Sequence, residues 1–243
     1  KDKKFADNVT FKGIAEDTAG FTGAELANIL NEAAIIATRK GHKEIDNIDI
    51  DEAVKKVTVG LEKHSRVMTE KDKKLTAYHE AGHAIVSQFL PTQQEVKEVS
   101  IVPRGMAGGY TMYKSDEDKY YISKTEMQEK LIALLGGRAA EQVALNEIST
   151  GASNDLEVAT KIARDMIAVY GMNDKIGPIS LKADNGEYDL ELFGENLKDT
   201  IGEEVKKIIN IAYNDAQTIL KQNMNKLDEI AAVLIEKEKI NEQ

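Results

Sequence analysis

The chain has 243 residues, of which 42% are hydrophobic and 30% charged, so it can bury a core and form one or two domains. Its 32 basic and 42 acidic residues give a net charge of −10, and with no Trp and 5% aromatic residues this composition argues against a nucleic-acid partner. The absence of Cys excludes disulfides, thiolate catalysis and Cys-based metal centres. No apolar run approaches the roughly 20 residues that cross a bilayer, so we expect a soluble chain.

The front of the chain predicts a compact helical module. Thr22 is followed three residues later by Glu25, which is a capping-box pattern, and apolar residues then recur at spacings of three and four. A short helix precedes this one, and an amphipathic helix follows it and ends at Gly60. Because a polar stretch comes next, we place the first domain at residues 1–64 and the second at residues 65–243.

A further helix is predicted to begin at Thr69 and to stop before Pro91, since proline cannot continue a helix. Two β-like runs follow, at residues 96–102 and 110–113, and a glycine-rich segment joins them. The simplest arrangement of these runs is a small antiparallel pair.

The rest of the chain predicts mostly helices. The expected elements are a helix from Ser123 to about Leu145, a helix from Ser153 or Asn154 to Gly171, a short strand at 179–181, and a helical hairpin from 197 to about 239 with a break near 223–225. The sequence therefore predicts a mainly α fold with a small antiparallel β element.

Two of the four histidines lie in the segment HEAGH at residues 79–83, within the helix that begins at Thr69. Four residues turn a helix by about 400°, so His79 and His83 lie about 40° apart and can reach one ion. Such a pair holds Zn²⁺ with a third protein ligand and a water whose pKa falls toward about 7, while Glu80 removes the proton. The motif predicts peptide-bond hydrolysis; the alternative is a pair of solvated histidines.

The third zinc ligand has to come from a distant part of the chain, and two carboxylates are candidates. Glu141 would complete the site from a neighbouring helix, whereas Asp155 would complete it from a helix N-terminus. A first-turn aspartate also commonly satisfies free helix N–H groups, so periodicity does not decide between the two. Gly82 indicates close packing against the motif, by another helix or by part of the site.

The β-like run that contains Ser100, Ile101 and Val102 offers a place for an extended substrate. A substrate that pairs with an exposed strand edge binds through backbone hydrogen bonds and needs no particular sequence. The alternative is a strand that the fold covers.

Four segments taken together resemble the FtsH family of ATP-dependent, membrane-anchored zinc metalloproteases. They are TAYHEAGHA at 76–84, IVPRG at 101–105, GGRAAE at 136–141 and STGASND at 149–155. The resemblance implies a helical zinc metalloprotease domain in which His79, His83 and Asp155 bind Zn²⁺ and Glu80 is the catalytic base. It also implies that Glu141 is a partner close to the ligands.

Residues 14–26 and 31–34 resemble the helical lid of this family's AAA+ ATPase module. In that lid, the positions that match Gly23 and Ala24 face the adenine nucleotide; the alternative is a plain helix start. The chain contains no GxxxxGK[ST] phosphate loop, so we expect no ATP hydrolysis from it. ATP and Mg²⁺ would belong to an ATPase core outside this fragment, as would a membrane anchor.

The resemblance further implies a homohexameric ring that uses ATP to unfold substrates and thread them into a proteolytic chamber. Its substrates would be unfolded or misfolded proteins. It would lie on the cytoplasmic side of a bacterial inner membrane, or on an organelle membrane. For this chain we expect ATP-independent cleavage of peptides and loosely folded proteins. A non-catalytic helical assembly or adaptor module is the alternative function.

Overall fold

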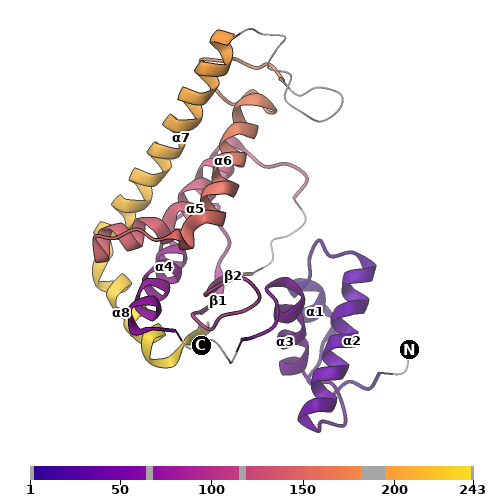
Figure 1. Cartoon of the computed structure of the whole chain (residues 1–243). Coiled ribbons are helices and arrows are strands. Elements are labelled where there is room, and N and C mark those ends of the chain that lie inside the picture. Colours follow the sequence, from indigo (N-terminus) through magenta and orange to yellow (C-terminus); the bar gives the residue numbers. More distant parts are fainter. Residues whose placement is uncertain (1–2, 64–67, 115–118, 182–194, 242–243) are drawn as a thin grey trace.

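A computed structural model of the chain describes residues 3–63, 68–114, 119–181 and 195–241 (Figure 1). The expected boundary between residues 64 and 65 lies outside these ranges. The helices are α1 (Phe11–Asp17), α2 (Gly23–Lys40), α3 (Asn47–Thr58), α4 (Glu70–Gln88), α5 (Lys124–Leu145), the 3-10 turn η1 (Thr150–Ala152), α6 (Ser153–Ala168), α7 (Glu195–Gln222) and α8 (Met224–Lys237). The strands are β1 (Val96–Ser100), β2 (Tyr110–Tyr113) and β3 (Lys239–Asn241), and the fold is mainly α, as predicted.

Helices α1 to α3 form a module with its own apolar core. The predicted capping box is present, because the Thr22 hydroxyl accepts from the Glu25 N–H and the Glu25 carboxylate accepts from the Thr22 N–H. Helix α2 ends at Gly41, whose φ of 76° suits a residue without a Cβ. The buried core residues are Ile29, Ala33, Ala37, Ile45, Ile50, Ala53 and Val54.

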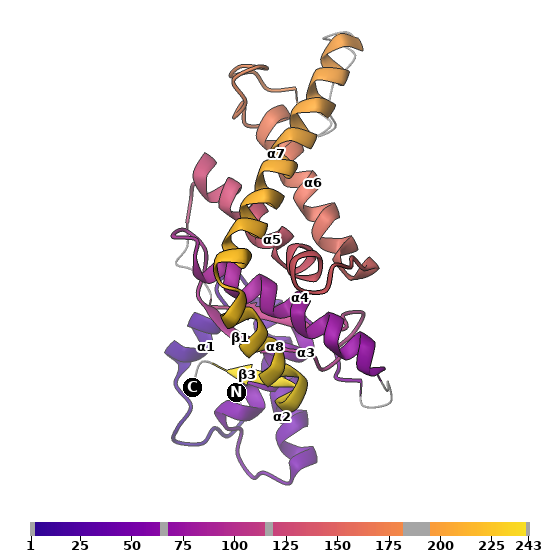
Figure 2. The same ribbon diagram turned by 90° about the vertical axis from the view of Figure 1, so that its left-hand side faces the viewer.

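Helices α4 and α5 cross closely at the centre of the second module. A Cβ on Gly82 would lie 2.5 Å from both the Ala140 Cβ and the Gly136 carbonyl oxygen, so only glycine fits at this crossing. The interpretation of Gly82 as a close-packing residue is confirmed, and the partner is another helix. Helix α7 runs along α5 and α6, and α8 packs against α4 (Figures 1 and 2). The predicted break in the terminal hairpin falls at Asn223.

The three strands form an antiparallel sheet in the order β2-β1-β3, so β1 is the central strand. Ser100 pairs with Tyr110 on one side and with Lys239 on the other. The prediction that Ser100, Ile101 and Val102 offer an exposed edge is therefore wrong. The physical reason is that β3 returns from the far end of the chain and occupies that side of β1. Strand β2 is instead the outer strand beside α4.

The prediction of a strand at 179–181 is also wrong, since the third strand is β3. The Leu181 N–H donates to the Ala168 carbonyl at the end of α6. The Leu181 side chain is buried with Ile167 and Ile201. Leu181 thus serves helix packing rather than strand pairing, whereas Ile179 is exposed.

Buried ion pairs join α3 to the sheet. Lys55, which is 2% exposed, donates to Glu98 of β1 over 2.6 Å. Arg104 donates to both carboxylate oxygens of Glu52 over 2.9 Å and to Glu62 over 2.8 Å. Charged pairs with such geometry fix the position of α3 against the sheet. None of the described helices is long and apolar enough to cross a membrane.

Candidate active site

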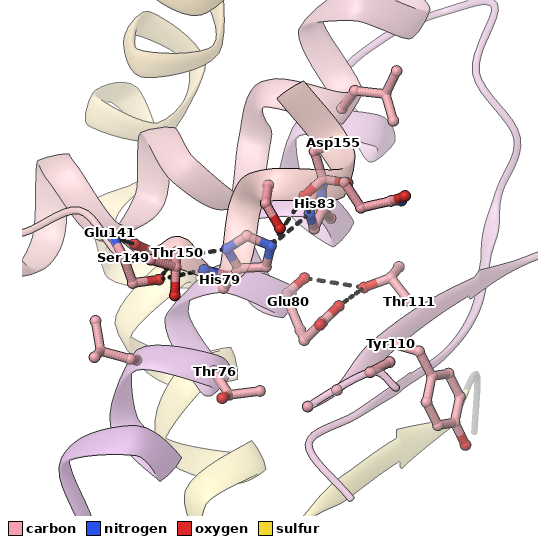
Figure 3. A pocket seen from close by; sticks show the side chains of 18 of the residues that line it. Thr76, His79, Glu80, His83, Tyr110, Thr111, Glu141, Ser149, Thr150 and Asp155 are labelled. Atoms are coloured by element: carbon pink, nitrogen blue, oxygen red, sulfur yellow. Dashed lines mark hydrogen bonds and ion pairs between the residues drawn. The ribbon is translucent and has the colours of Figure 1, made fainter. Parts of the chain in front are cut away.

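The two histidines of α4 point their Nε2 atoms at the same region (Figure 3). His79 donates its Nδ1–H to Glu141 Oε1 over 2.7 Å, and His83 donates its Nδ1–H to the Ala133 carbonyl over 2.9 Å. The two Nε2 atoms lie 3.1 Å apart. In the neutral form of each ring the proton sits on Nδ1, so both Nε2 lone pairs are left to bind one cation.

Asp155 completes the cluster from the first turn of α6. Its Oδ2 lies 3.3 Å from His79 Nε2 and 3.5 Å from His83 Nε2. A tetrahedral Zn²⁺ with ligands at about 2.0–2.1 Å holds its ligand atoms about 3.3–3.4 Å apart. The three protein atoms therefore match the ligand set of Zn²⁺ in both chemistry and spacing, and they leave the fourth position to water or substrate.

Glu141 lies on the other side of His79 from Asp155. It is 1% exposed, and its two oxygens accept from His79, from the Ser149 N–H at 2.6 Å and from the Ser149 hydroxyl at 3.0 Å. Burial works against its charge, but the hydrogen bonds with His79 and Ser149 outweigh it and lower the pKa of Glu141. An ionised Glu141 fixes both the tautomer and the plane of the His79 ring.

The charges of the cluster favour a cation at its centre. Burial opposes a charge on His79, but the hydrogen bonds with Asp155 and Glu141 outweigh it and raise the pKa of His79 to about 10. Burial also opposes the charge on Asp155, yet the hydrogen bonds with His79 and His83 lower the pKa of this carboxyl. A positive charge, either a proton or a metal ion, therefore belongs between these groups.

Glu80 follows His79 on α4 and turns its carboxylate toward β2 (Figure 3). It is 7% exposed, and its Oε2 accepts a hydrogen bond of 2.9 Å from the Thr111 hydroxyl. Burial is the main cause that raises the pKa of Glu80 above its ordinary value. A raised pKa suits a group that takes and returns a proton near neutral pH.

A cleft of about 950 Å³ opens over the cluster. The five residues described above line this cleft together with apolar groups from α4, β2, α5 and the loop before β2. Among these apolar groups are Leu75, Met106, Tyr113 and Leu134. Such a mixture of apolar surface and a few convergent polar groups is typical of a substrate site.

Sequence reasoning missed two residues of this site, Thr111 and Gly137. A Cβ on Gly137 would lie 2.6 Å from His79 Nε2 and from His83 Nε2, so a glycine leaves room for the imidazoles. The signal was present in the sequence, because two adjacent glycines inside a helix carry a cost of about 1 kcal/mol each that packing or function has to explain. Thr111 had no such signal.

Gly23 and Ala24 lie apart from this cluster, in the first turn of α2, and both are exposed. The structure places no other predicted site residue beside them.

A second group of possible metal ligands, at the start of α3, is explained by helix capping. Asp46 accepts the Asp49 N–H, and Asp49 in turn accepts the Asp46 N–H. Asp49 is also paired with Lys40 over 3.1 Å and with His42 over 2.9 Å. These partners already balance its charge, so the geometry does not call for a metal ion.

Comparison with known proteins follows the same division of the chain. Residues 66–243 match the model of peptidase family M41, and residues 8–52 match the AAA+ lid domain. Similar proteins include the ATP-dependent zinc metalloprotease FtsH of Caldicellulosiruptor bescii, which is 52% identical over 99% of this chain and 40% of its own length. FtsH 1 of a Thermoanaerobacter species is 49% identical over 99% of this chain and 41% of its own length, and FtsH of Thermotoga maritima is 42% identical over the same shares.

The chain thus spans about two fifths of the length of these relatives. The M41 match covers the whole of the metal cluster and the cleft, and the lid match covers α1, α2 and the first half of α3. On these grounds the chain belongs to the FtsH family, peptidase family M41.

Proposed function

We propose that this chain is a zinc-dependent endopeptidase that cleaves unfolded or extended polypeptides. In this proposal His79, His83 and Asp155 hold Zn²⁺, and Glu80 is the catalytic base. The observation that carries it is the triangle of two Nε2 atoms and one Oδ2 atom with edges of 3.1, 3.3 and 3.5 Å. The names of the relatives, zinc metalloproteases, support the same chemistry.

The residues divide the reaction among them. When bound, Zn²⁺ supplies a Lewis acid that polarises the scissile carbonyl and lowers the pKa of water at the site toward about 7. Glu80 takes a proton from the attacking water and returns it to the leaving amine, so one carboxyl acts first as base and then as acid. Glu141 holds the His79 ring in its ligand orientation through the bond of 2.7 Å to Nδ1.

The outer strand β2 supports an extended substrate. Its residues Tyr110, Thr111 and Tyr113 line the cleft, and in the described part of the chain the only strand paired with β2 is β1. A polypeptide laid along the other side of β2 would gain backbone hydrogen bonds that do not depend on its sequence. Only an unfolded or extended segment can present its backbone in this way.

We infer a larger assembly for the full-length protein. Its zinc domain would occupy residues 65–243, and residues 1–64 would be the lid of an AAA+ ATPase, in which Gly23 and Ala24 face the nucleotide. Separate apolar cores, one built by residues before 60 and three built by residues after 75, support this division. An ATP-driven homohexamer, anchored with its active sites on the cytoplasmic side of a bacterial inner membrane, is the arrangement we propose.

The test is a Glu80→Gln variant of the chain, purified without a His-tag and incubated with fluorescein-labelled casein. Wild-type protein should contain about one Zn²⁺ per chain and cleave casein without ATP, whereas the variant should keep the metal and lose cleavage. The matched control is Glu229→Gln on the exposed face of α8, which should cleave as wild type does. Cleavage by Glu80→Gln would show that Glu80 is not the catalytic base. Wild-type protein that contains no zinc and does not cleave casein would favour the assembly or adaptor function.

A further inference from the structure

We propose that Thr111 is a positioning residue for Glu80, and that its hydroxyl decides which carboxylate oxygen receives the proton. The inference rests on the proposed function, in which Glu80 is the base. The Thr111 Oγ1 lies 2.9 Å from Glu80 Oε2 and 3.3 Å from the Glu80 carbonyl oxygen. Both distances are within hydrogen-bond reach.

Helix α4 fixes the backbone of Glu80 but leaves its carboxylate free to rotate. Three side-chain torsions separate the carboxylate from the helix, so a partner outside α4 has to select one orientation. Among the described residues, Thr111 is the donor to Oε2, and no protein group donates to Oε1. A carboxylate held at one oxygen presents the other oxygen to the proton that it has to accept.

Gly109 leaves room for the carboxylate on its Oε1 side. A Cβ on Gly109 would lie 2.9 Å from Glu80 Oε1, 2.7 Å from Thr76 Cγ2 and 2.8 Å from the Ser100 carbonyl oxygen. The glycine therefore allows the start of β2 to lie directly against α4. This approach brings Thr111, two residues later, within reach of Glu80.

Strand alternation explains why Thr111, and not its neighbour, faces Glu80. Successive side chains of a strand point to opposite faces, and Tyr110 points to the face that meets α3. The Tyr110 hydroxyl donates to Glu98 over 2.6 Å, and Glu98 accepts from Lys55 over 2.6 Å. A register slip of one residue would break this buried network and turn Thr111 away from Glu80, so the network fixes the register.

The consequence for the reaction is geometric. The Thr111 hydroxyl remains a donor to Oε2 before and after proton transfer, because the proton that Glu80 accepts goes to Oε1. The same oxygen then faces the leaving amine. A carboxylate held in this way does not have to rotate between accepting the proton and donating it. Thr111 should therefore affect kcat rather than KM.

The experiment compares Thr111→Val, which keeps the shape and removes the hydroxyl, with Thr111→Ser, which keeps the hydroxyl. Thr160→Val is the matched control, since Thr160 is also half-buried and its hydroxyl donates to the Leu156 carbonyl on α6. With an internally quenched peptide as substrate, Thr111→Val should lower kcat about 10- to 100-fold and leave KM within about twofold. Thr111→Ser should recover kcat to within about threefold of wild type, and Thr160→Val should match wild type.

Zinc content and a parallel assay of Glu80→Gln complete the test. Zinc should stay at about one per chain in all variants, because Thr111 does not touch a ligand. An unchanged kcat in Thr111→Val, a loss shared by Thr111→Ser, or an effect confined to KM would overturn the positioning role. An active Glu80→Gln would instead overturn the proposed function, so the two failures are distinguishable.

Discussion

Replacing Gly137 by alanine should separate helix stability from metal binding. Alanine is favoured over glycine inside a helix by about 1 kcal/mol, so on propensity alone the change should stabilise α5. The added Cβ, however, would lie 2.6 Å from His79 Nε2 and His83 Nε2. Ordinary contact begins at about 3.5 Å, so the rings have to retreat by about 0.9 Å.

That displacement exceeds what a zinc site tolerates. Ligand distances vary by only about 0.2 Å, and His79 is locked by its bond of 2.7 Å to Glu141. Loss of the geometry of one charge-assisted hydrogen bond costs about 1.5–3 kcal/mol, which corresponds to a zinc affinity about 10- to 100-fold weaker. Gly137→Ala should therefore bind zinc weakly and cleave slowly while it remains folded.

The assay is competition for Zn²⁺ against a colorimetric chelator, together with thermal unfolding of the metal-free protein. Gly202→Ala is the matched control, because Gly202 lies in α7 and, among the described residues outside its own stretch of helix, none has an atom within 4 Å of a Cβ built on it. The control should gain up to about 1 kcal/mol of stability and keep wild-type zinc affinity. Wild-type zinc affinity in Gly137→Ala would refute the steric reasoning.

Two further predictions concern the carboxylates. Asp155→Asn should empty the zinc site, whereas Glu141→Gln should weaken zinc binding about 10- to 100-fold, so that the site still fills at high zinc concentration. Chelator titrations measure both affinities. Equal losses of zinc affinity in the two variants would contradict the distinction between ligand and supporting group. Burial opposes the charge on Glu98, but Lys239, Lys55 and Tyr110 lower its pKa below 4.5, so the stability that it contributes is complete above about pH 4.5 and is lost as pH falls through the lowered pKa. Denaturant unfolding at a series of pH values should therefore show that the free energies of unfolding of wild type and Glu98→Gln approach each other below pH 4.5. A difference between these free energies that does not change with pH would contradict the prediction.

Local signals in the sequence predicted the helices well and placed His79 and His83 on one face of a helix. Thr22 with Glu25 and Ser123 with Glu126 are capping boxes in the structure, and the helix before Pro91 ends at Gln88. These features depend on residues three or four positions apart, which the sequence displays directly. The histidine pair was predictable for the same reason.

Features that depend on distant residues were not predictable in the same way. Strand β3 pairs with β1 across about 140 residues, and its three residues carry no strand pattern of their own, so the exposed edge was assigned to the wrong strand. Leu181 looked like part of a strand because burial against helices and burial in a sheet select the same apolar residues. The choice between Glu141 and Asp155 likewise needed either the family resemblance or the packing of α5 and α6 around α4.

The ion pairs between α3 and the sheet also have a mechanical consequence. Separating Lys55 from Glu98 would break a buried charged hydrogen bond, which contributes about 1.5–3 kcal/mol, although Asp51 would still pair with Lys55 and Lys239 would still pair with Glu98. Arg104, clamped by both oxygens of Glu52, adds a second rigid link. A displacement of α3 should therefore move β1 and β2 with it. Any hinge for large motions has to lie elsewhere in the protein.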